Sequence, residues 1–384
     1  MKALLALLFL IVNLYASSIE VGAEQLKKYL PLLTNKKVAL VVNHASVVKQ
    51  KHLVDVLLEN GVAVKQIFAP EHGFRGKADA GEHLKNGVDV KSGLPIVSLY
   101  GKHKKPTSQD LNNVDIIVFD IQDVGVRFYT YLSTLHYIME AAAENGVKVI
   151  VLDRPNPNGS RIDGPVIQKE FYSFVGLHPV PILYGMTIGE YALMINGQGW
   201  LKGGVKANLE VIQLQNYTHN SFYHLSIKPS PNLPNDRAIK LYPSLALFEG
   251  TVISAGRGTH KQFQLYGAPL YNIHDFSFTP TPQEGAKYPK HKNKICYGVD
   301  LSALDVQKLH QENGMDIGYL KDAYKNYSDK KQFFLKNGFF ERLVGTDLLR
   351  QQVIDDVSEK EICQSWEEGL VQFKSIRQKY LLYP

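Results

Sequence analysis

The sequence is poor in cysteine and in long apolar runs. Only two cysteines, Cys296 and Cys363, occur among its 384 residues. An even count permits one disulfide, yet a chain of this length folds without one, so two free thiols are an equal expectation. Beyond the N-terminus, no segment approaches the roughly 18 consecutive apolar residues that a membrane-spanning helix needs. The sequence therefore predicts a globular body without a membrane span.

Several catalytic signatures are also missing. The turn after the first expected strand reads NHAS and lacks G-x-G-x-x-G, and the chain has no P-loop. It contains no G-x-S-x-G nucleophile elbow, no H-E-x-x-H and no C-x-x-C. These absences argue against a dinucleotide enzyme, a nucleotide triphosphatase and a serine hydrolase.

The charge balance excludes another class of partner. The formal net charge is only +6, with 45% apolar and 21% charged residues, as in ordinary globular proteins. No basic stripe suited to nucleic acid occurs, although an anionic substrate or wall polymer is compatible with this charge. The basic tract KHKK at 102–105 is most simply a solvated loop.

Residues 1–17 are typical of a secretory signal peptide. Lys2 precedes an apolar run that is short for a membrane span, and Ala16 and Ser17 supply small residues for cleavage. Cleavage is favoured over a retained anchor. We therefore expect an exported protein, periplasmic or secreted. Its oligomeric state cannot be read from the sequence.

Alternating strand and helix patterns predict an α/β fold with an open, mainly parallel, Rossmann-like sheet. Several of the expected strands are continuously apolar, which is typical of strands buried on both faces of a sheet. Helical patterns cover 53–61, 132–146 and 187–199, with a weaker one near 107–113. The expected strands are 37–43, 62–68, 94–100, 115–121, 147–153 and 208–214.

A second, smaller α+β domain is expected after a boundary near 235–245. The predicted division is 18–238 and 239–384, after the signal segment. In the second part 295–301 is strand-like, whereas stretches beginning at Gly318 and Thr346 are helix-like. The tail from Ser358 opens with a capping box and continues as an amphipathic helix.

Polar residues follow almost every expected strand of the sheet. In open α/β sheets ligands bind at the carboxyl ends of the strands, so these residues predict one cleft at that edge. They are Asn43 and His44, Glu71 and His72, Tyr100, Asp120 with Asp123, Arg127 and Tyr129, and Asp153 with Arg154 and Asn156.

The stretch FAPEHGFRG at 68–76 carries the strongest catalytic candidate. Glu71 follows a proline-stiffened turn, and flanking Phe68 and Phe74 would favour its protonated form. Glycoside cleavage needs such an acid to protonate the leaving oxygen, with a second carboxylate or a substrate acetamido group opposite it. Asp120 is the leading second carboxylate, ahead of Glu82, Asp123 and Asp153.

Two alternatives stay open at this point. A metal-dependent hydrolase could use the imidazoles and carboxylates of the same loops, since these suit zinc. Its candidate ligands are His44, Glu71, His72, Glu82, His83 and His103. A non-catalytic cell-wall-binding protein is the other alternative.

A set of motifs resembles a known family. The chain resembles the exo-β-N-acetylmuramidase family of peptidoglycan hydrolases from about residue 35 to the C-terminus. The motifs that carry the resemblance are, in order, APEHGFRG, VFDIQDVGVRFYTY, VLDRPNPNG, SPNLP, YPSLALFEGT and GRGT. The resemblance implies a Rossmann-like catalytic domain, a C-terminal ancillary domain and neither a metal nor an organic cofactor. It implies release of N-acetylmuramic acid from the non-reducing end of wall fragments, with Glu71 as the catalytic residue.

The implied substrate suggests roles for further residues. Muramic acid carries a lactyl carboxylate that an arginine fork would bind, and at least two of the four candidate arginines are expected only to pair with an aspartate. Those arginines are Arg75, Arg127, Arg154 and Arg257. Tyr129 is expected to stack on sugar. The candidate sugar-hydroxyl partners are Asn43, His72, Asn156, Glu249 and Gln262.

Overall fold

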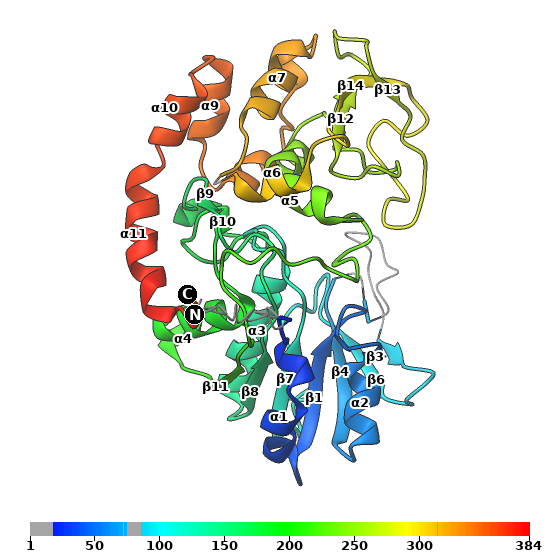
Figure 1. Ribbon diagram of the computed structural model, residues 1–384, viewed down its shortest axis with the longest axis vertical. Helices are drawn as coiled ribbons and strands as arrows, with labels where there is room; N and C mark the ends of the chain where they lie inside the picture. The colour runs from blue at the N-terminus through cyan, green and yellow to red at the C-terminus, as the bar shows by residue number, and fades with distance from the viewer. Residues whose placement is uncertain (1–17, 72, 75–85, 313) are drawn as a thin grey trace, which may run out of the picture.

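The computed structural model describes residues 18–71, 73–74, 86–312 and 314–384. Figure 1 shows two stacked parts, with the central sheet in the lower part and most of the later helices above it. None of the helices in these ranges is long and apolar enough to cross a membrane.

The central sheet has seven strands in the order β11-β8-β7-β1-β4-β6-β5. Every pairing between neighbouring strands is parallel except that of β5 with β6, so the predicted mainly parallel α/β sheet is confirmed. The strands are β1 (Lys37–Val42), β4 (Ala63–Ala69), β5 (Gly87–Val88), β6 (Pro95–Ser98), β7 (Ile116–Asp120), β8 (Lys148–Leu152) and β11 (Asn208–Ile212).

Each face of the sheet is covered by its own pair of helices. In β1, Ala39 and Val41 pack into one buried cluster, whereas Val38 and Leu40 pack into the other. This alternation follows from the two-residue repeat of a strand, and burial on both faces explains the unbroken apolar runs. The first cluster includes residues of α3 (Tyr131–Glu144) and α4 (Ile188–Gly197), and the second includes residues of α1 (Leu26–Leu33) and α2 (Leu53–Glu59).

The second part combines helices with a three-stranded antiparallel sheet in the order β12-β14-β13. Helix α5 (Asp236–Leu245) runs through the residues where we expected the domain boundary. The other elements are β12 (Leu265–Ala268), β13 (Ser277–Phe278), β14 (Cys296–Asp300), α6 (Val306–Gln311), α7 (Gly318–Asn326), α8 (Phe339–Val344), α9 (Leu348–Ile354), α10 (Glu359–Gln364) and α11 (Glu367–Arg377).

Three details differ from the predicted elements. Residues 107–113 form turns, in which Asp110 accepts a hydrogen bond from the backbone of Thr107, and not a helix. Helix α5 was not predicted because it contains Pro243, although Asn235 caps its start by accepting from Ala238. The C-terminal helix is divided into α10 and α11.

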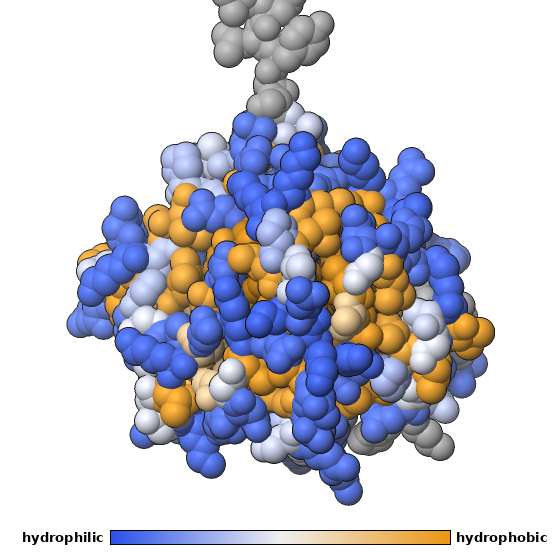
Figure 2. Space-filling view, turned by 90° about the horizontal axis from the view of Figure 1, so that it is seen from below, coloured by the Kyte–Doolittle hydropathy of each residue, from blue (hydrophilic) through white to orange (hydrophobic). Residues whose placement is uncertain are grey.

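Other local predictions are confirmed. Capping boxes form at Thr187 with Glu190 and at Ser358 with Glu361. For the cysteines, where a disulfide and free thiols were equal expectations, the structure has free thiols at Cys296 and Cys363. Figure 2 shows the molecule from below, on the side away from the later helices, where hydrophilic side chains interrupt the apolar ones.

The C-terminal tail is held on the sheet by two buried carboxylates. Tyr383 donates from its hydroxyl to Asp153 at 2.6 Å, and the backbone N–H of Leu382 donates to Glu190 at 2.8 Å. Asp153 also accepts from the Thr187 hydroxyl and the Gly189 N–H, both at 2.8 Å. Asp153 therefore connects the end of β8, the start of α4 and the tail.

Asp153 predicts a pH-dependent stability. Burial raises its pKa to about 7, against the opposing effect of its hydrogen bonds to Tyr383, Thr187 and Gly189. In the unfolded chain Asp153 loses its proton near its usual pKa of 3.8, whereas the folded state retains it. The unfolded state then binds fewer protons, so this group lowers the free energy of unfolding as pH rises from about 4 to 7, with no further change above.

Urea unfolding of the Asp153→Asn variant between pH 4 and 8 tests this expectation. The variant should show a shallower decline with pH than the wild type. Asp347→Asn, at an exposed aspartate, serves as the matched control and should keep the wild-type slope. An unchanged slope in Asp153→Asn would contradict the expectation.

Candidate active site

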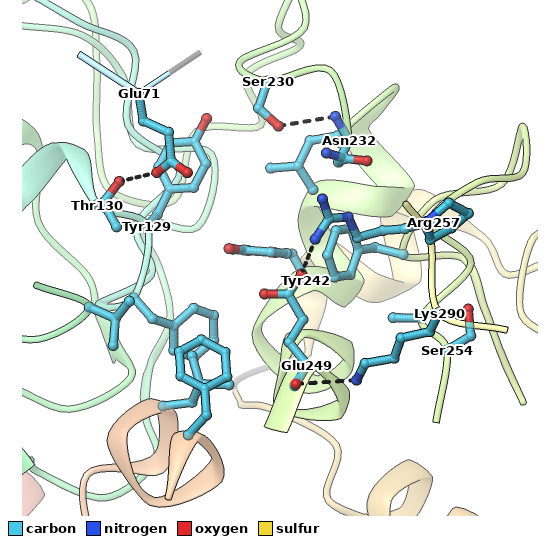
Figure 3. Close-up of a pocket in the computed structure, with 18 of the residues that line it drawn as sticks. Glu71, Tyr129, Thr130, Ser230, Asn232, Tyr242, Glu249, Ser254, Arg257 and Lys290 are labelled. Atoms are coloured by element: carbon cyan, nitrogen blue, oxygen red, sulfur yellow. Dashed lines mark hydrogen bonds and ion pairs between the residues drawn. The ribbon is translucent and has the colours of Figure 1, made fainter. Parts of the chain in front are cut away.

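A cavity of about 520 Å³ lies where the carboxyl edge of the sheet meets the second part of the chain. Its walls come from both parts, as Figure 3 shows for Glu71 and Thr130 on one side and Glu249 and Arg257 on the other. Among the described residues that line it, Glu71 and Glu249 are the two carboxylates. Two opposed carboxylates in one cavity can support acid–base chemistry on a bound ligand.

Glu71 is placed by the end of β4 and the start of α3. It follows Ala69, the last residue of the strand, after a single proline. The hydroxyl of Thr130, the residue that precedes α3, donates to Glu71 Oε2 at 2.7 Å. The neighbouring Tyr131 is buried, and burial together with the negative charge of Glu71 raises the pKa of its hydroxyl. The carboxyl group thus has a defined orientation and aromatic surroundings.

The flanking phenylalanines lie elsewhere than we expected. Phe68 is fully buried in the core on the α3 side of the sheet. Phe74 belongs to the cluster on the other face and packs edge-on against His52, with ring centroids 4.9 Å apart. The apolar wall of the cavity comes from other residues: Phe128, Tyr129, Tyr131, Tyr242 and Phe263.

The opposite wall holds an ion pair. Arg257 Nη1 donates to Glu249 Oε1 at 3.0 Å, and Arg257 Nη2 donates to the carbonyl of Gly285 at 3.2 Å. Figure 3 shows Tyr242 between this pair and Glu71. Burial raises the pKa of Tyr242 well above its usual value, and the negative charges of Glu249 and Glu71 add to the effect. Tyr242 therefore stays a neutral phenol between the two carboxylates.

Lys290 has a structural role in the same wall. Its ammonium donates to the carbonyls of Phe248 at 2.7 Å and Glu249 at 3.2 Å, and also contacts those of Thr251 and Ile253. These carbonyls lie at the end of the short helix Ala246–Gly250, which the lysine caps. Burial lowers the pKa of Lys290 to about 8. Arg257, and not Lys290, is therefore the cation available to a ligand.

Comparison with known proteins shows the family to which the chain belongs. The family model described as exo-β-N-acetylmuramidase NamZ, N-terminal, matches residues 38–237, and its C-terminal counterpart matches residues 240–383. The chain belongs to the exo-β-N-acetylmuramidase family. The two matches together cover nearly all of the described chain.

Individual relatives support the same membership. The chain is 40% identical to the peptidoglycan β-N-acetylmuramidase NamZ of Bacillus subtilis, over 93% of this chain and 89% of that protein. Two crystal structures of DUF1343 family proteins from Bacteroides fragilis are also similar. The first is 46% identical with a TM-score of 0.89, and the match covers 96% of this chain and 99% of that one. The second is 30% identical with a TM-score of 0.78, and the match covers 95% of this chain and 99% of that one.

Asp120 and Arg154 do not line the cavity of this exo-β-N-acetylmuramidase family member. Asp120 is fully buried and forms a two-point ion pair with Arg154, in which Nη2 lies 2.9 Å from Oδ2. Arg154 also donates to the carbonyl of Val47 at 3.1 Å. The pair therefore holds the ends of neighbouring strands together. This placement gives no support to the catalytic role predicted for Asp120 or to the substrate-binding role predicted for Arg154.

Arg127 was also expected to bind substrate, and the structure places its guanidinium away from the cavity lining. It is buried and donates to four backbone carbonyls at 2.6 to 2.8 Å. Two of them belong to Pro165 and Val180, and two to Leu343 and Val344 at the end of α8. Burial lowers its pKa to about 9. Arg127 thus joins the two parts of the chain. Of the three described candidate arginines, only Arg154 pairs with an aspartate.

The remaining predicted residues divide into those at the cavity and those behind it. Tyr129 lines the cavity, and its hydroxyl donates to the carbonyl of Pro229 at 2.8 Å. Asn43 is buried and donates to the Tyr131 hydroxyl at 3.0 Å, so it supports a cavity residue from behind. Asn156 is buried and donates to the carbonyl of Met186. Gln262 is also buried and is not among the lining residues.

Part of the predicted site lies outside the described residues, namely His72, Arg75, Glu82 and His83. Of the other proposed metal ligands, His44 Nε2 contacts the carbonyl of Lys228 at 2.7 Å and His103 Nε2 lies 3.1 Å from Asp110. No group of three histidine, cysteine, aspartate or glutamate side chains within the described ranges could hold a metal ion.

Sequence reasoning missed several cavity residues. Asn232 and Tyr242 lie in SPNLP and YPSLALFEGT, motifs that carried the family resemblance but received no individual roles. Asn232 donates to the Gly285 carbonyl at 2.8 Å, the same carbonyl that Arg257 contacts. Thr130 lies in VFDIQDVGVRFYTY, another motif of the resemblance, and also received no role. Lys290 had no sequence signal, because its role depends on contacts across the fold.

Proposed function

We propose that this protein is an exo-acting glycoside hydrolase that removes terminal N-acetylmuramic acid from the non-reducing end of peptidoglycan fragments, with Glu71 as the general acid. The observation that carries this proposal is the position of Glu71 in an aromatic-lined cavity, opposite Glu249 and Arg257. Family membership supports the substrate class.

The chemistry needs one proton transfer and one water. Glu71 donates its proton to the glycosidic oxygen as the bond from that oxygen to the anomeric carbon breaks, and a water molecule supplies the hydroxyl of the released sugar. The Thr130 hydroxyl orients the Glu71 carboxyl group for this step. Glu249 is the other carboxylate of the cavity. An inverted anomer released first would assign Glu249 as the base that activates the water, whereas a retained anomer would indicate a double displacement through a carboxylate or the substrate acetamido group.

Arg257 is the proposed partner of the lactyl carboxylate. It faces the cavity and is held in place by Glu249 and the Gly285 carbonyl. We expect Arg257→Met to lower kcat/KM about 10- to 150-fold, because a hydrogen bond to a charged group contributes about 1.5–3 kcal/mol. Steady-state kinetics on a muramic-acid-terminated disaccharide measures this, with Arg342→Met on the exposed end of α8 as the control. Unchanged kinetics would assign the carboxylate to another residue.

The decisive experiment uses the purified mature protein and the same disaccharide. Proton NMR should show free N-acetylmuramic acid and its first anomer, at the same rate with and without chelator. Loss of turnover with chelator would instead identify a metal-dependent hydrolase. Sugar binding without any turnover would identify a wall-binding protein.

We also propose that the protein is exported, with residues 1–17 removed. The apolar run after Lys2 and the small residues Ala16 and Ser17 support this. N-terminal sequencing of the protein from the exported fraction should begin at or near Ser18. A chain that starts at Met1 would contradict cleavage.

A further inference from the structure

Two lysines stand over aromatic rings that line the cavity. The Lys104 ammonium lies 4.3 Å from the centroid of Phe174, and the Lys292 ammonium lies 5.9 Å from that of Tyr288. Both rings belong to the cavity lining, one from each part of the chain. The mechanism proposed above uses none of these four residues.

The lysine of the first pair differs from its neighbours in the KHKK tract. His103 and Lys105 lie 3.1 Å and 2.6 Å from carboxylates, of Asp110 and Glu140. For Lys104, by contrast, the described part of the chain provides no carboxylate within ion-pair distance. Phe174 holds it instead, with its own ring stacked on Tyr137 at 6.3 Å. A cation over an aromatic face is stabilised without losing its charge, so it stays available to an anion.

The second pair marks the opening of the cavity. Tyr288 lines the cavity and is nevertheless 88% exposed, which places its ring at the edge. Its partner Lys292 is also exposed. An exposed tyrosine offers an apolar face with a polar end, a combination well suited to contact with a sugar ring. The edge of the cavity thus presents the accessible ring of Tyr288 with the Lys292 ammonium beside it, and the Lys104 ammonium stands over a second ring of the lining. Glu71 is less exposed than Tyr288.

The chemistry of the substrate supplies a matching ligand. A peptidoglycan strand without its stem peptides alternates N-acetylglucosamine with N-acetylmuramic acid, so a free lactyl carboxylate recurs on every second sugar. When the terminal muramic acid lies at Glu71, the leaving N-acetylglucosamine occupies the opening and the next muramic acid lies just outside. We propose that the opening is an outer subsite, in which Tyr288 stacks on the leaving sugar and Lys104 and Lys292 bind the carboxylate of the following muramic acid.

This inference rests on the proposed function and predicts a preference for longer chains. The test compares kcat/KM on a disaccharide and a tetrasaccharide of the denuded glycan, both with muramic acid at the non-reducing end. The wild type should favour the tetrasaccharide, less so at high salt, because exposed charges are screened. Lys104→Met and Lys292→Met should each lower the tetrasaccharide value about two- to fivefold, as expected for an exposed ion pair, and leave the disaccharide value unchanged.

Two further variants make the test specific. Tyr288→Ala should lower kcat/KM for both substrates, because both carry the leaving sugar. Lys102→Met, at an exposed lysine of the same loop, should behave as the wild type. Equal wild-type rates on both substrates, or lysine variants that keep the wild-type ratio, would overturn the outer subsite and leave the proposed function intact. If the wild type cleaves neither substrate, the proposed function itself fails.

Discussion

Glu71→Gln should lower kcat by about 10²–10⁴-fold, the usual contribution of a general acid. Glutamine keeps the size of the side chain and can still accept the hydrogen bond from Thr130, but it has no proton to give. The effect should depend on the leaving group. An aryl muramide with an acidic phenol needs little protonation, so on that substrate the variant should lose much less activity. Steady-state kinetics on the disaccharide and on the aryl muramide measures both values.

The matched control is Glu341→Gln, at a glutamate of α8 that does not line the cavity. It should retain wild-type kcat on both substrates. Equal losses on the two substrates in Glu71→Gln would show that Glu71 does something other than protonate the leaving oxygen. A fully active Glu71→Gln variant would show that Glu71 is not the general acid.

Asp120→Asn should act on stability and not on catalysis. Removing one partner of a buried ion pair typically costs about 3–5 kcal/mol, because the other charge stays buried without compensation. Asp120 and Arg154 are such a pair, with Asp120 fully buried. Urea unfolding should therefore show a large loss in the free energy of unfolding. The folded fraction should keep kcat within about threefold of the wild type.

A double-mutant cycle makes the expectation specific to the pair. Asp120→Leu combined with Arg154→Met removes both charges, so it should cost clearly less than the sum of the single changes. Additive costs would show that the two groups act independently. A loss of kcat in stable Asp120→Asn protein, comparable to that of Glu71→Gln, would restore Asp120 as a catalytic group.

The repeating patterns of the fold were readable from the sequence because they are local. Unbroken apolar runs such as 37–43 are typical of strands buried on both faces, and each strand predicted for the central sheet reappears there. Capping residues at Thr187 and Ser358 act over three positions and were also predicted correctly. Helix α5 was not predicted: it carries Pro243 in its interior, and its cap at Asn235 lies in a stretch rich in proline and asparagine.

The polar residues at the ends of the strands were harder to interpret. The sequence placed them at one edge of the sheet but did not distinguish those that face the cavity from those that point into the core. Arg127, Arg154 and Arg257 have the same side chain. One donates to backbone carbonyls, one pairs with Asp120, and one faces the cavity beside Glu249.

The sequence by itself determined the sheet, the family motifs and the position of Glu71 after β4, because each depends on residues close together in the chain. The tertiary structure alone decided which groups surround Glu71. Thr130 lies 59 positions from Glu71, and the Arg257 wall comes from the second part of the chain. Contacts between residues so far apart in the chain depend on how its two parts pack against each other. Arg127 contributes to this packing, because it donates to backbone carbonyls of both parts.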